Sequence, residues 1–267
     1  MDIIQKAESI YQTLSKQESK VALAVIQRQL PVQNMTITEL AKCLNVSAAT
    51  ITRFCKKMDC SNFFDLKLKL NASQNDRQQE LQTSDTSIAV YNFYQTVISE
   101  TQNRLDEATV KKVVTLIINS TRIFIFGLGS SGYTAKEFGQ RLIRMGLKAT
   151  AITDSHMMFI TAVIMQPQDL LIGLSTSGKT KEVIDAMEIA KKNGASTVAL
   201  TGFQNSGITH VSDHTLFFQN STFVDNQRFI NSQFAMTYVI DIISMLLLED
   251  EKLNDNMKRT VEMINNL

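Results

Sequence analysis

Two glycine-rich segments of the chain have the residue types and spacing of phosphate-binding loops. GLSTSGKT at 173–180 satisfies the P-loop pattern G-x-x-x-x-G-K-[ST], and GLGSSG at 127–132 satisfies the dinucleotide pattern G-x-G-x-x-G. Each follows a predicted strand and opens a predicted helix, where backbone N–H groups and the helix dipole favour an anion. Both segments also offer hydroxyl donors, at Ser130, Ser131, Ser175, Thr176, Ser177 and Thr180.

The first interpretation, a P-loop ATPase, lacks a partner residue. Such a site needs an acid at the end of a neighbouring strand to hold the magnesium ion. The predicted strands TVALTG and HTLFFQN end without an acid, and the acids of SMLLLEDE continue a helical pattern that starts at Ser232. The P-loop pattern therefore lacks its context in this chain.

The second interpretation, a dinucleotide site for NAD(H), has a candidate acid. Asp154 lies 22 residues beyond Gly132, close to the roughly 20-residue offset of a ribose-binding carboxylate. Joined to a DNA-binding domain, such a site would make a redox-sensing repressor. This interpretation assigns no role to residues 173–180 and does not explain the hydroxyls of both segments, but it stays open.

The third interpretation uses both segments for one small phosphorylated ligand. One segment would hold the phosphate and the other the remaining polar atoms, with helix N-termini supplying a positive field. Such a site requires neither a metal ion nor a cofactor, and we expect neither. Lys179 would add positive charge, although a solvated lysine in the first helical turn is the simpler role.

The elements that position these segments alternate between strand and helix from Thr121 onward. RIFIFG, KATAIT, DLLIGL, TVALTG and HTLFF are short runs rich in strand-forming residues, while AKEFGQRLIRMG and KEVIDAMEIAKKNG are helical and end in a glycine. This alternation predicts an α/β domain with a parallel sheet flanked by helices. Ligands of such sheets bind at the carboxyl ends of the strands, which is where both segments belong.

The first 126 residues contain no glycine and are predicted to form successive helices. Capping boxes start two of them, at Ser15/Glu18 and Thr36/Glu39. The second of these breaks at Asn45-Val46, and Ser47 can cap a new helix over 48–58. Two short helices joined by a tight turn form a helix-turn-helix arrangement.

The second helix of this pair has an apolar side with Ile51, Phe54 and Cys55, and a side of small, hydroxyl and basic residues opposite. Such a side can enter the major groove of DNA, where hydroxyls and cations reach bases or phosphates. The candidate DNA-binding residues are Ser47, Ala48, Ala49, Thr50, Thr52, Arg53, Lys56 and Lys57. A plain helical pair in a bundle is the alternative. A further helix after Ser61 would brace the unit through Phe63, Phe64, Leu66 and Leu68.

The composition is that of an ordinary globular chain with a modest basic bias at one end. Its 267 residues are 44% hydrophobic and 20% charged, with a net charge of +1. Residues 1–82 carry 11 Lys+Arg against 8 Asp+Glu, which suits a polyanion partner. No run suits a bilayer span, no signal peptide opens the chain, and three cysteines without metal-site spacing fit a reducing compartment. We therefore expect a cytoplasmic protein without a membrane partner.

A polar segment separates the helical part from the α/β part. NASQNDRQQELQTSDT at 71–86 has almost no apolar residue and is typical of an inter-domain linker. We therefore predict a helix-turn-helix DNA-binding domain over residues 1–75, a linker and connecting helix over 76–106, and the α/β ligand-binding domain over 107–267.

These motifs together resemble a known family. GLGSSGYTAKEFGQRLIRMG, STSGKTKEVIDAMEIAKKNGA and VALTGFQNSGITHVSDHTL resemble a sugar isomerase (SIS) domain, and TITELAKCLNVSAATITRFCKKMDCSNFFDLKLKL resembles the N-terminal domain of RpiR-type transcriptional regulators. The order, helix-turn-helix then SIS, is that of the RpiR family, so the resemblance covers nearly the entire chain. It implies a regulator of sugar metabolism, not an enzyme, that binds palindromic operator DNA as a homodimer or homotetramer. A phosphosugar effector would modulate that binding.

The resemblance also implies roles for individual residues. The phosphate would be held by Ser175, Ser177 and Thr180, with Ser130 and Ser131 near the sugar and Thr176 in the same loop. Glu182 matches a position that meets a sugar hydroxyl, with helix capping or solvation as the alternative. His156 falls where the family often has a histidine, with a structural role as the alternative. Because isomerisation of a sugar needs a base, these last two residues leave a phosphosugar isomerase open as an alternative function.

Two positions depart from the family pattern. Family members often carry a glycine in the turn after the recognition helix, where this chain has Asp59. The family pattern S-S-R before the long helix is replaced by the segment Asn231-Ser232-Gln233. If that arginine touches the effector in relatives, the ligand preference of this chain differs, unless nearby Arg228 substitutes for it.

Overall fold

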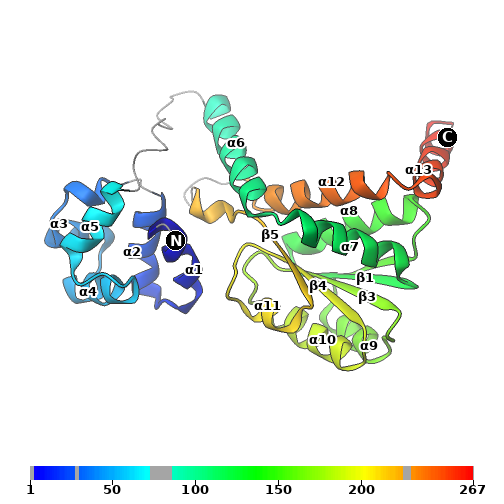
Figure 1. Cartoon of the computed structure of the whole chain (residues 1–267), viewed down its shortest axis with the longest axis horizontal. Coiled ribbons are helices and arrows are strands. Elements are labelled where there is room, and N and C mark those ends of the chain that lie inside the picture. The colour runs from blue at the N-terminus through cyan, green and yellow to red at the C-terminus, as the bar shows by residue number, and fades with distance from the viewer. Residues whose placement is uncertain (1–2, 28–29, 73–85, 225–229, 267) are drawn as a thin grey trace. The chain divides into compact units, whose positions relative to one another are not determined.

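The computed structural model describes residues 3–27, 30–72, 86–224 and 230–266. The chain divides into two compact units, one of Met1–Thr96 with Ser221–Ile230 and the other of Val97–Asn220 with Asn231–Leu267. Figure 1 traces the elements of each unit along the chain. The domain boundaries predicted from the sequence, at residues 75 and 106, stay a prediction.

The first unit is helical. Its helices are α1 (Ile3–Ile10), α2 (Lys16–Gln27), α3 (Ile37–Leu44), α4 (Ala48–Lys57) and α5 (Phe63–Ala72), with 3₁₀ turns η1 (Tyr11–Thr13), η2 (Val32–Asn34) and η4 (Ser221–Phe223). Both predicted capping boxes are present. In the box that starts α3, the Glu39 N–H donates to Thr36 Oγ1 (3.2 Å) and the Thr36 N–H donates to Glu39 Oε2 (2.7 Å). Ser15 and Glu18 exchange the same two bonds before α2.

Helix α4 turns its apolar side into the core of this unit. Ile51, Phe54 and Cys55 are fully buried, as predicted. Helix α2 packs against α4 and contributes the buried Val21 and Val25. Because these residues of α4 are buried, the residues on the opposite side of the helix face outward.

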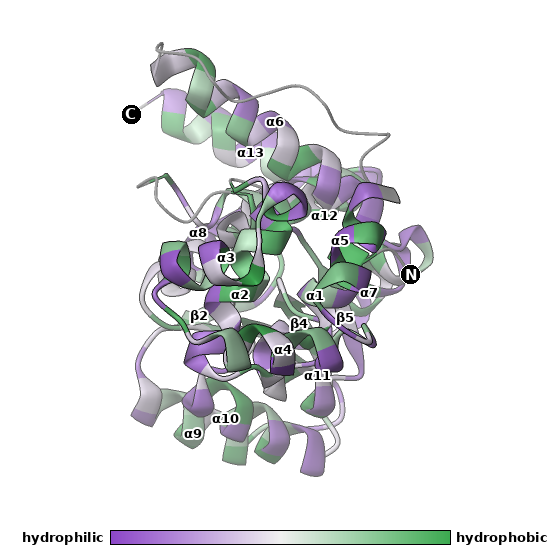
Figure 2. Cartoon of the chain, turned by 90° about the vertical axis from the view of Figure 1, so that its left-hand side faces the viewer, coloured by the Kyte–Doolittle hydropathy of each residue, from purple (hydrophilic) through white to green (hydrophobic). Residues whose placement is uncertain are grey.

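The prediction that four apolar residues of α5 pack against the rest of the helical unit is only partly right. Phe63 and Leu66 are buried, but Phe64 is 63% and Leu68 is 52% exposed. A helix presents one side to its core, and here Phe63, Leu66 and Leu70, at i, i+3 and i+7, occupy that side. Figure 2 shows the resulting bands of hydrophobic and hydrophilic residues along α5.

The second unit is an α/β fold around a five-stranded parallel sheet. Its strands are β1 (Arg122–Gly127), β2 (Ala149–Ile152), β3 (Asp169–Leu174), β4 (Ser196–Thr201) and β5 (His214–Phe217), in the order β2-β1-β3-β4-β5. Each predicted strand run forms one of these strands. The predicted fold class, a helical domain followed by an α/β domain with a parallel sheet, is confirmed.

Helices cover both faces of the sheet. Those of this unit are α7 (Glu107–Asn119), α8 (Ser130–Arg144), α9 (Ser155–Val163), α10 (Lys181–Lys192), α11 (Gly207–Val211), α12 (Phe234–Leu247) and α13 (Glu251–Asn265), and α6 (Thr86–Arg104) precedes them. Helices α9, α10 and α11 lie on one face, and α7, α8 and α12 lie on the other (Figure 1). In the described ranges, no helix has both the length and the apolar character needed to span a membrane.

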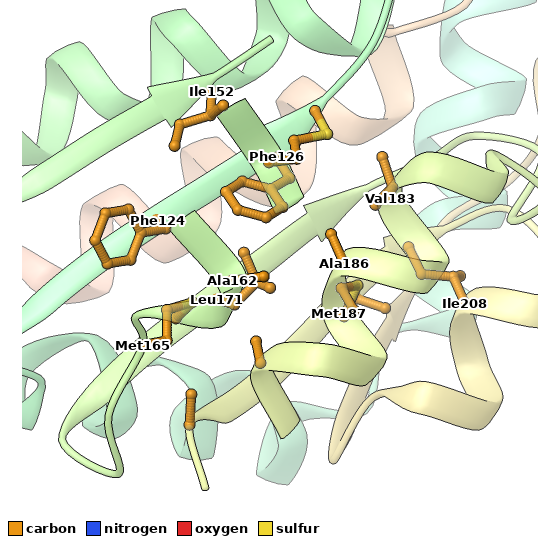
Figure 3. Packing of buried hydrophobic residues seen from close by; sticks show 14 residues of the cluster. Phe124, Phe126, Ile152, Ala162, Met165, Leu171, Val183, Ala186, Met187 and Ile208 are labelled. Carbon is orange, nitrogen blue, oxygen red and sulfur yellow. The ribbon is translucent and has the colours of Figure 1, made fainter. Parts of the chain in front are cut away.

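A hydrophobic cluster holds α9 and α10 against the sheet. Figure 3 shows Phe126 and Leu171 of the strands directed toward Ala162 of α9 and toward Val183 and Ala186 of α10. Phe126 is fully buried, and removal of such a ring typically costs about 3–5 kcal/mol. This cluster anchors the helices whose first residues form the edge described below.

Candidate functional site

The strand order brings the two glycine-rich segments together. β1 and β3 are direct neighbours, with Phe126 paired to Gly173 and Gly127 paired to Leu174. The segments 127–132 and 173–180 therefore leave the sheet from paired positions. Since β2 lies on one side of β1 and β4 on the far side of β3, this is the point where the strand order reverses, which is the usual ligand site of an open α/β sheet.

One glycine in each segment has a backbone conformation that L side chains rarely adopt. Gly129 has φ +56° and ψ −130°, and it is the residue from which α8 starts. Gly178 has φ +65°, and a Cβ there would lie 2.1 Å from Ser206 Oγ. At these two glycines, each segment can turn sharply from its strand into the helix that follows.

Three helices begin at this edge without a side-chain cap. Elsewhere the N-cap side chain accepts a backbone N–H at the start of α3, α4, α7, α9 and α13. The N-cap residues of α8, α10 and α12, which are Gly129, Thr180 and Gln233, make no such bond. The N-cap side chains thus occupy none of the first N–H groups of these helices, although the Gln233 N–H itself donates to Asn231 Oδ1 (2.9 Å). Helix starts that meet in this way form a positively polarised environment for an anion.

Gln233 links the three helix starts. Its Oε1 accepts from Ser131 Oγ (3.2 Å) in the first turn of α8, and its Nε2 donates to Thr176 Oγ1 (3.2 Å) before α10. Thr134 Oγ1 (3.5 Å) and Ser232 Oγ (3.2 Å) complete the contacts of the amide. The Gln233 side chain is buried. The bond between Gln233 and Ser131 therefore joins two residues that lie 102 positions apart in the sequence.

The other hydroxyls of the segments divide into buried and exposed. Ser175 is buried, and its Oγ lies 2.9 Å from Thr180 Oγ1. Ser177 is exposed, and its Oγ accepts the Lys179 N–H (3.2 Å). Ser130 is exposed in the first turn of α8. The structure thus brings Ser131 and Thr176 together through Gln233 and brings Ser175 and Thr180 together directly.

Two predicted site residues are not joined to this network. Glu182 is half-buried in the first turn of α10. His156 is exposed in the first turn of α9, which follows β2 at the same sheet edge. Neither side chain hydrogen-bonds to the described residues of the two segments. Their predicted roles stay predictions, and Arg228 lies outside the described residues.

The structure bears on the two alternative interpretations. β1 and β4, the neighbours of β3, end at Gly127 and Thr201, so neither places an acid beside the segment 173–180. Asp154, the candidate ribose-binding acid, caps α9 by accepting the Met157 N–H (2.9 Å). Its carboxylate therefore has a structural role that requires no nucleotide. In the described parts of the chain, no three His, Cys, Asp or Glu side chains gather in a way that could hold a metal ion.

The predicted helix-turn-helix is formed by α3 and α4. Asn45 ends α3 in a left-handed conformation (φ 50°, ψ 53°), and Ser47 caps α4 by accepting the Thr50 N–H (3.1 Å). Asn tolerates this conformation better than most residues because its short polar side chain can bond locally. The turn between the helices is therefore encoded by local residues.

The outward side of α4 carries most of the predicted DNA-binding residues. Those that are exposed are Ser47, Ala48, Ala49, Thr52, Arg53, Lys56 and Lys57. The prediction that Thr50 lies on the outward side is wrong, because this residue is only 3% exposed. Its hydroxyl lies 2.9 Å from Ser47 Oγ and accepts from Arg53 Nη2 (3.2 Å). Thr50 lies three residues after the N-cap, so its side chain bonds to Ser47 at the helix start. It accepts a hydrogen bond from Arg53 and thereby orients that side chain, rather than facing DNA itself.

Lys57 has a partner within the helical unit. Its Nζ lies 2.8 Å from Glu18 Oε2, and the Glu18 side chain is buried. Burial by itself raises the pKa of Glu18, but hydrogen bonds from Lys57 and from Ser15 outweigh it and lower the pKa to about 2. This ion pair ties α2 to the end of α4.

Asp59, the first departure from the family pattern, adopts the conformation that glycine would. Its φ is 50°, in the left-handed region, directly after α4. Its carboxylate pairs with Lys6 of α1, and this hydrogen bond lowers the pKa of Asp59. The turn thus keeps its shape without glycine and gains a contact to α1.

Gln233 and Thr134 are the site residues that sequence reasoning missed. Gln233 was noted only as a departure from a family pattern, although its place directly before a long apolar helix is a signal for a helix start. Thr134 lies one helical turn after Ser130, so it shares a side of α8 with the first segment. No sequence pattern links either residue to the segment 173–180.

Comparisons with known proteins give a consistent result. Residues 1–78 match the helix-turn-helix domain of the rpiR family, and residues 116–246 match the SIS domain. An uncharacterized HTH-type transcriptional regulator of Haemophilus influenzae is 34% identical over 263 residues, which cover 94% of this chain and 91% of that protein.

One of two solved structures matches nearly the whole chain, and the other matches the α/β part. The NanR protein of Vibrio vulnificus, in complex with ManNAc-6P, is 25% identical with a TM-score of 0.63, over 99% of this chain and 98% of that one. The sugar isomerase domain of an RpiR transcription factor from Sphaerobacter thermophilus has a TM-score of 0.61 over 68% of this chain and 99% of that one. At 20% identity, this second likeness shows the fold alone.

Proposed function

Because the chain belongs to the rpiR family of HTH-type transcriptional regulators, we propose that its helix-turn-helix binds operator DNA and that its SIS domain binds a phosphosugar that modulates this binding. The observation that carries the proposal is the meeting of three helix starts whose N-cap side chains make no capping bond, those of α8, α10 and α12, at the switch point of the sheet. Such a place suits a phosphate without a metal ion.

The effector would use hydroxyls from both segments. Ser175, Ser177 and Thr180 would hold the phosphate, with Ser130 and Ser131 near the sugar. Thr176, Glu182 and His156 complete the proposed set. Support comes from the NanR structure, in which a protein of the same architecture is complexed with ManNAc-6P.

The chain is a regulator and not an enzyme, as the names of its relatives indicate. Within α4, Arg53 and Lys56 would contact bases or phosphates from the exposed side, while Ala48 and Ala49 would allow close approach. We assign DNA binding to residues 1–75 and effector binding to residues 107–267.

A single helix-turn-helix reads one half-site, so a palindromic operator would require at least two copies of the chain. We therefore propose a homodimer or homotetramer that acts in the cytoplasm. Sedimentation velocity of the full chain at several concentrations, alone and with operator DNA, tests this part. A monomer on operator DNA would contradict it.

Fluorescence anisotropy of labelled DNA from upstream of the protein's own gene tests the function. The protein is titrated at fixed salt, because affinity for DNA depends strongly on salt. Hexose, amino-sugar and pentose phosphates are then added, with NADH and ATP as controls. A shift in DNA affinity with one sugar phosphate is the expected result.

Other outcomes would each replace part of the proposal. A shift with NADH alone would indicate a redox-sensing repressor, and a shift with ATP alone would restore the P-loop interpretation. Affinity that is the same for every DNA sequence would remove the operator-binding role.

A further inference from the structure

We infer that Gln233 makes the effector site selective for a neutral sugar phosphate, a ligand whose phosphate is its only anionic group, over phosphorylated sugar acids that also carry a carboxylate. This inference rests on the proposed function, since it concerns the ligand of the same site. It follows from the contacts of Gln233 and from the charges of the three segments that meet there.

The Gln233 amide is satisfied without a ligand. Its Oε1 accepts from Ser131 (3.2 Å), and its Nε2 donates to Thr176 and Ser232. Thr134 Oγ1 lies 3.5 Å from Oε1, but its single hydrogen has a nearer acceptor in the Ser130 carbonyl (3.3 Å). Both donor positions of the amide and one of its two acceptor positions are thus used. A buried amide with this many partners keeps the segments 127–132 and 173–180 at a fixed separation.

The same segments carry little positive charge. Among residues 127–132, 173–180 and 231–236, the basic side chain is Lys179, which is exposed. Glu182, in the first turn of α10, adds a half-buried carboxylate nearby. Charge compensation for a bound anion therefore comes mainly from the starts of α8, α10 and α12, which suffice for one phosphate.

Among the described residues, the side chain of Gln233 contacts hydroxyls and no cation, so these offer a second anionic group no matching charge there. A carboxylate beside Gln233 would lose its hydrogen bonds to water. The N–H and O–H donors that could replace them, those of Gln233, Ser131 and Thr176, are already bonded to one another. A sugar hydroxyl or an acetamido group, in contrast, can exchange hydrogen bonds with the amide and the hydroxyls of Thr176 and Ser131 without a change in charge. Gln233 thus acts as a positioning residue whose neutrality sets the ligand class.

The test measures binding to the full chain by isothermal titration calorimetry. The probes are glucose 6-phosphate, N-acetylglucosamine 6-phosphate and 6-phosphogluconate, with inorganic phosphate as the common fragment. 6-Phosphogluconate differs from glucose 6-phosphate in its carboxylate and also in its open-chain form, since glucose 6-phosphate is mainly a pyranose ring. Sorbitol 6-phosphate, which is open-chain and carries no carboxylate, is therefore the matched neutral probe. We expect the tighter neutral probe to bind at least about tenfold more tightly than the acid, which corresponds to one unsatisfied buried polar group.

Two variants change the charge at this position in opposite directions. Gln233→Arg should reduce the preference for the neutral probe or invert it, because the guanidinium can pair with a carboxylate. Gln233→Glu should weaken binding of every probe and the acid most. Gln140→Arg is the matched control, since it adds the same charge at an exposed position farther along α8, and it should leave the preference unchanged.

The outcomes separate this inference from the proposed function. Wild-type protein that binds 6-phosphogluconate as tightly as the neutral probes would overturn the inference and leave a phosphosugar regulator. A preference that shifts equally in Gln233→Arg and Gln140→Arg would remove the role of Gln233. Absence of binding to every sugar phosphate, neutral and acidic, would remove the proposed effector function and the inference with it. If Gln233→Arg does not fold, the inference is tested by the ligand preference of the wild type and by the effect of Gln233→Glu on binding of each probe.

Discussion

The Glu18 side chain is buried in the helical unit and yet remains a carboxylate. Lys57 of α4 and the Ser15 N–H and hydroxyl all donate to it, which lowers its pKa from 4.5 to about 2. Because the folded state favours the charged form, this group stabilises the fold above its ordinary pKa. The stabilisation is lost as the pH falls from 4.5 toward about 2.

We predict that Glu18→Gln lowers the free energy of unfolding by about 2 kcal/mol near neutral pH, since Lys57 and Ser15 lose a charged acceptor. The difference between wild type and variant should shrink in acid, across the window in which Glu18 of the wild type becomes protonated. Urea unfolding of the full chain, followed by far-UV circular dichroism at a series of pH values, measures it. Glu8→Gln on α1 serves as the control. A difference that is constant with pH would contradict the role of the carboxylate.

At the scale of the element, the helix starts divide by function. Helices α7 and α13, which carry no proposed site residue, are each capped by a side chain, that of Asp106 and that of Asp250. Where three helices meet at the proposed effector site, the N-cap side chains make no cap. A cap would occupy the N–H groups that an anion needs, so its absence there costs local helix stability and leaves a binding place.

We predict that Ser47→Ala lowers stability by about 1 kcal/mol, because α4 loses its N-cap. Ser47→Asp should keep the cap and the stability but weaken operator binding, because an added negative charge would face phosphates of DNA. Thermal unfolding and anisotropy with operator DNA separate the two effects. Asp106→Ala, which removes the cap of α7, is the control and should lower stability without weakening DNA binding. Retained operator affinity in Ser47→Asp would place the start of α4 away from the DNA.

For the whole molecule, the proposal assigns DNA and effector to different units of one chain. Coupling between two sites is reciprocal: if the effector changes operator affinity by some factor, operator DNA changes effector affinity by the same factor. This relation holds whatever conformational change connects the units. It therefore gives a test that requires no knowledge of how the units are arranged.

We predict that Arg53→Ala weakens operator binding and leaves effector affinity intact in the absence of DNA. The triple variant of Ser175, Ser177 and Thr180 to Ala should do the reverse. Because Ser175 and Thr180 bond each other, their joint removal leaves neither hydroxyl unpaired. Calorimetry with the effector and anisotropy with the operator measure both affinities for each variant.

Asp169→Asn is the control for general destabilisation. Asp169 is buried at the start of β3, at the sheet edge opposite the glycine-rich segments, and its Oδ1 accepts from Arg122 Nε (2.8 Å). Its loss should lower stability but leave both affinities unchanged. Equal loss of both affinities in Arg53→Ala, or unchanged effector binding in the triple variant, would contradict separate sites.

The sequence by itself determined the features that depend on neighbours within a few residues. The capping boxes at Thr36 and Ser15, the Ser47 cap and the five strand runs were all predicted, because a cap links residues three apart and a short apolar run is local. The family resemblance added the order of the two domains and the names of candidate residues. Thr50, Phe64 and Leu68 were assigned to the wrong sides, since periodicity leaves the exact orientation of a short helix uncertain by about one residue.

Only the tertiary structure decided which distant segments meet. The pairing of β1 with β3 placed 127–132 beside 173–180. The amide of Gln233 joined both, from 102 residues beyond Ser131 and 57 residues beyond Thr176. Such contacts arise from the packing of helices on both faces of the sheet, which no local pattern encodes. The sequence thus predicted two loops with the residue types of phosphate sites, and the fold placed them side by side, joined by the neutral side chain of Gln233.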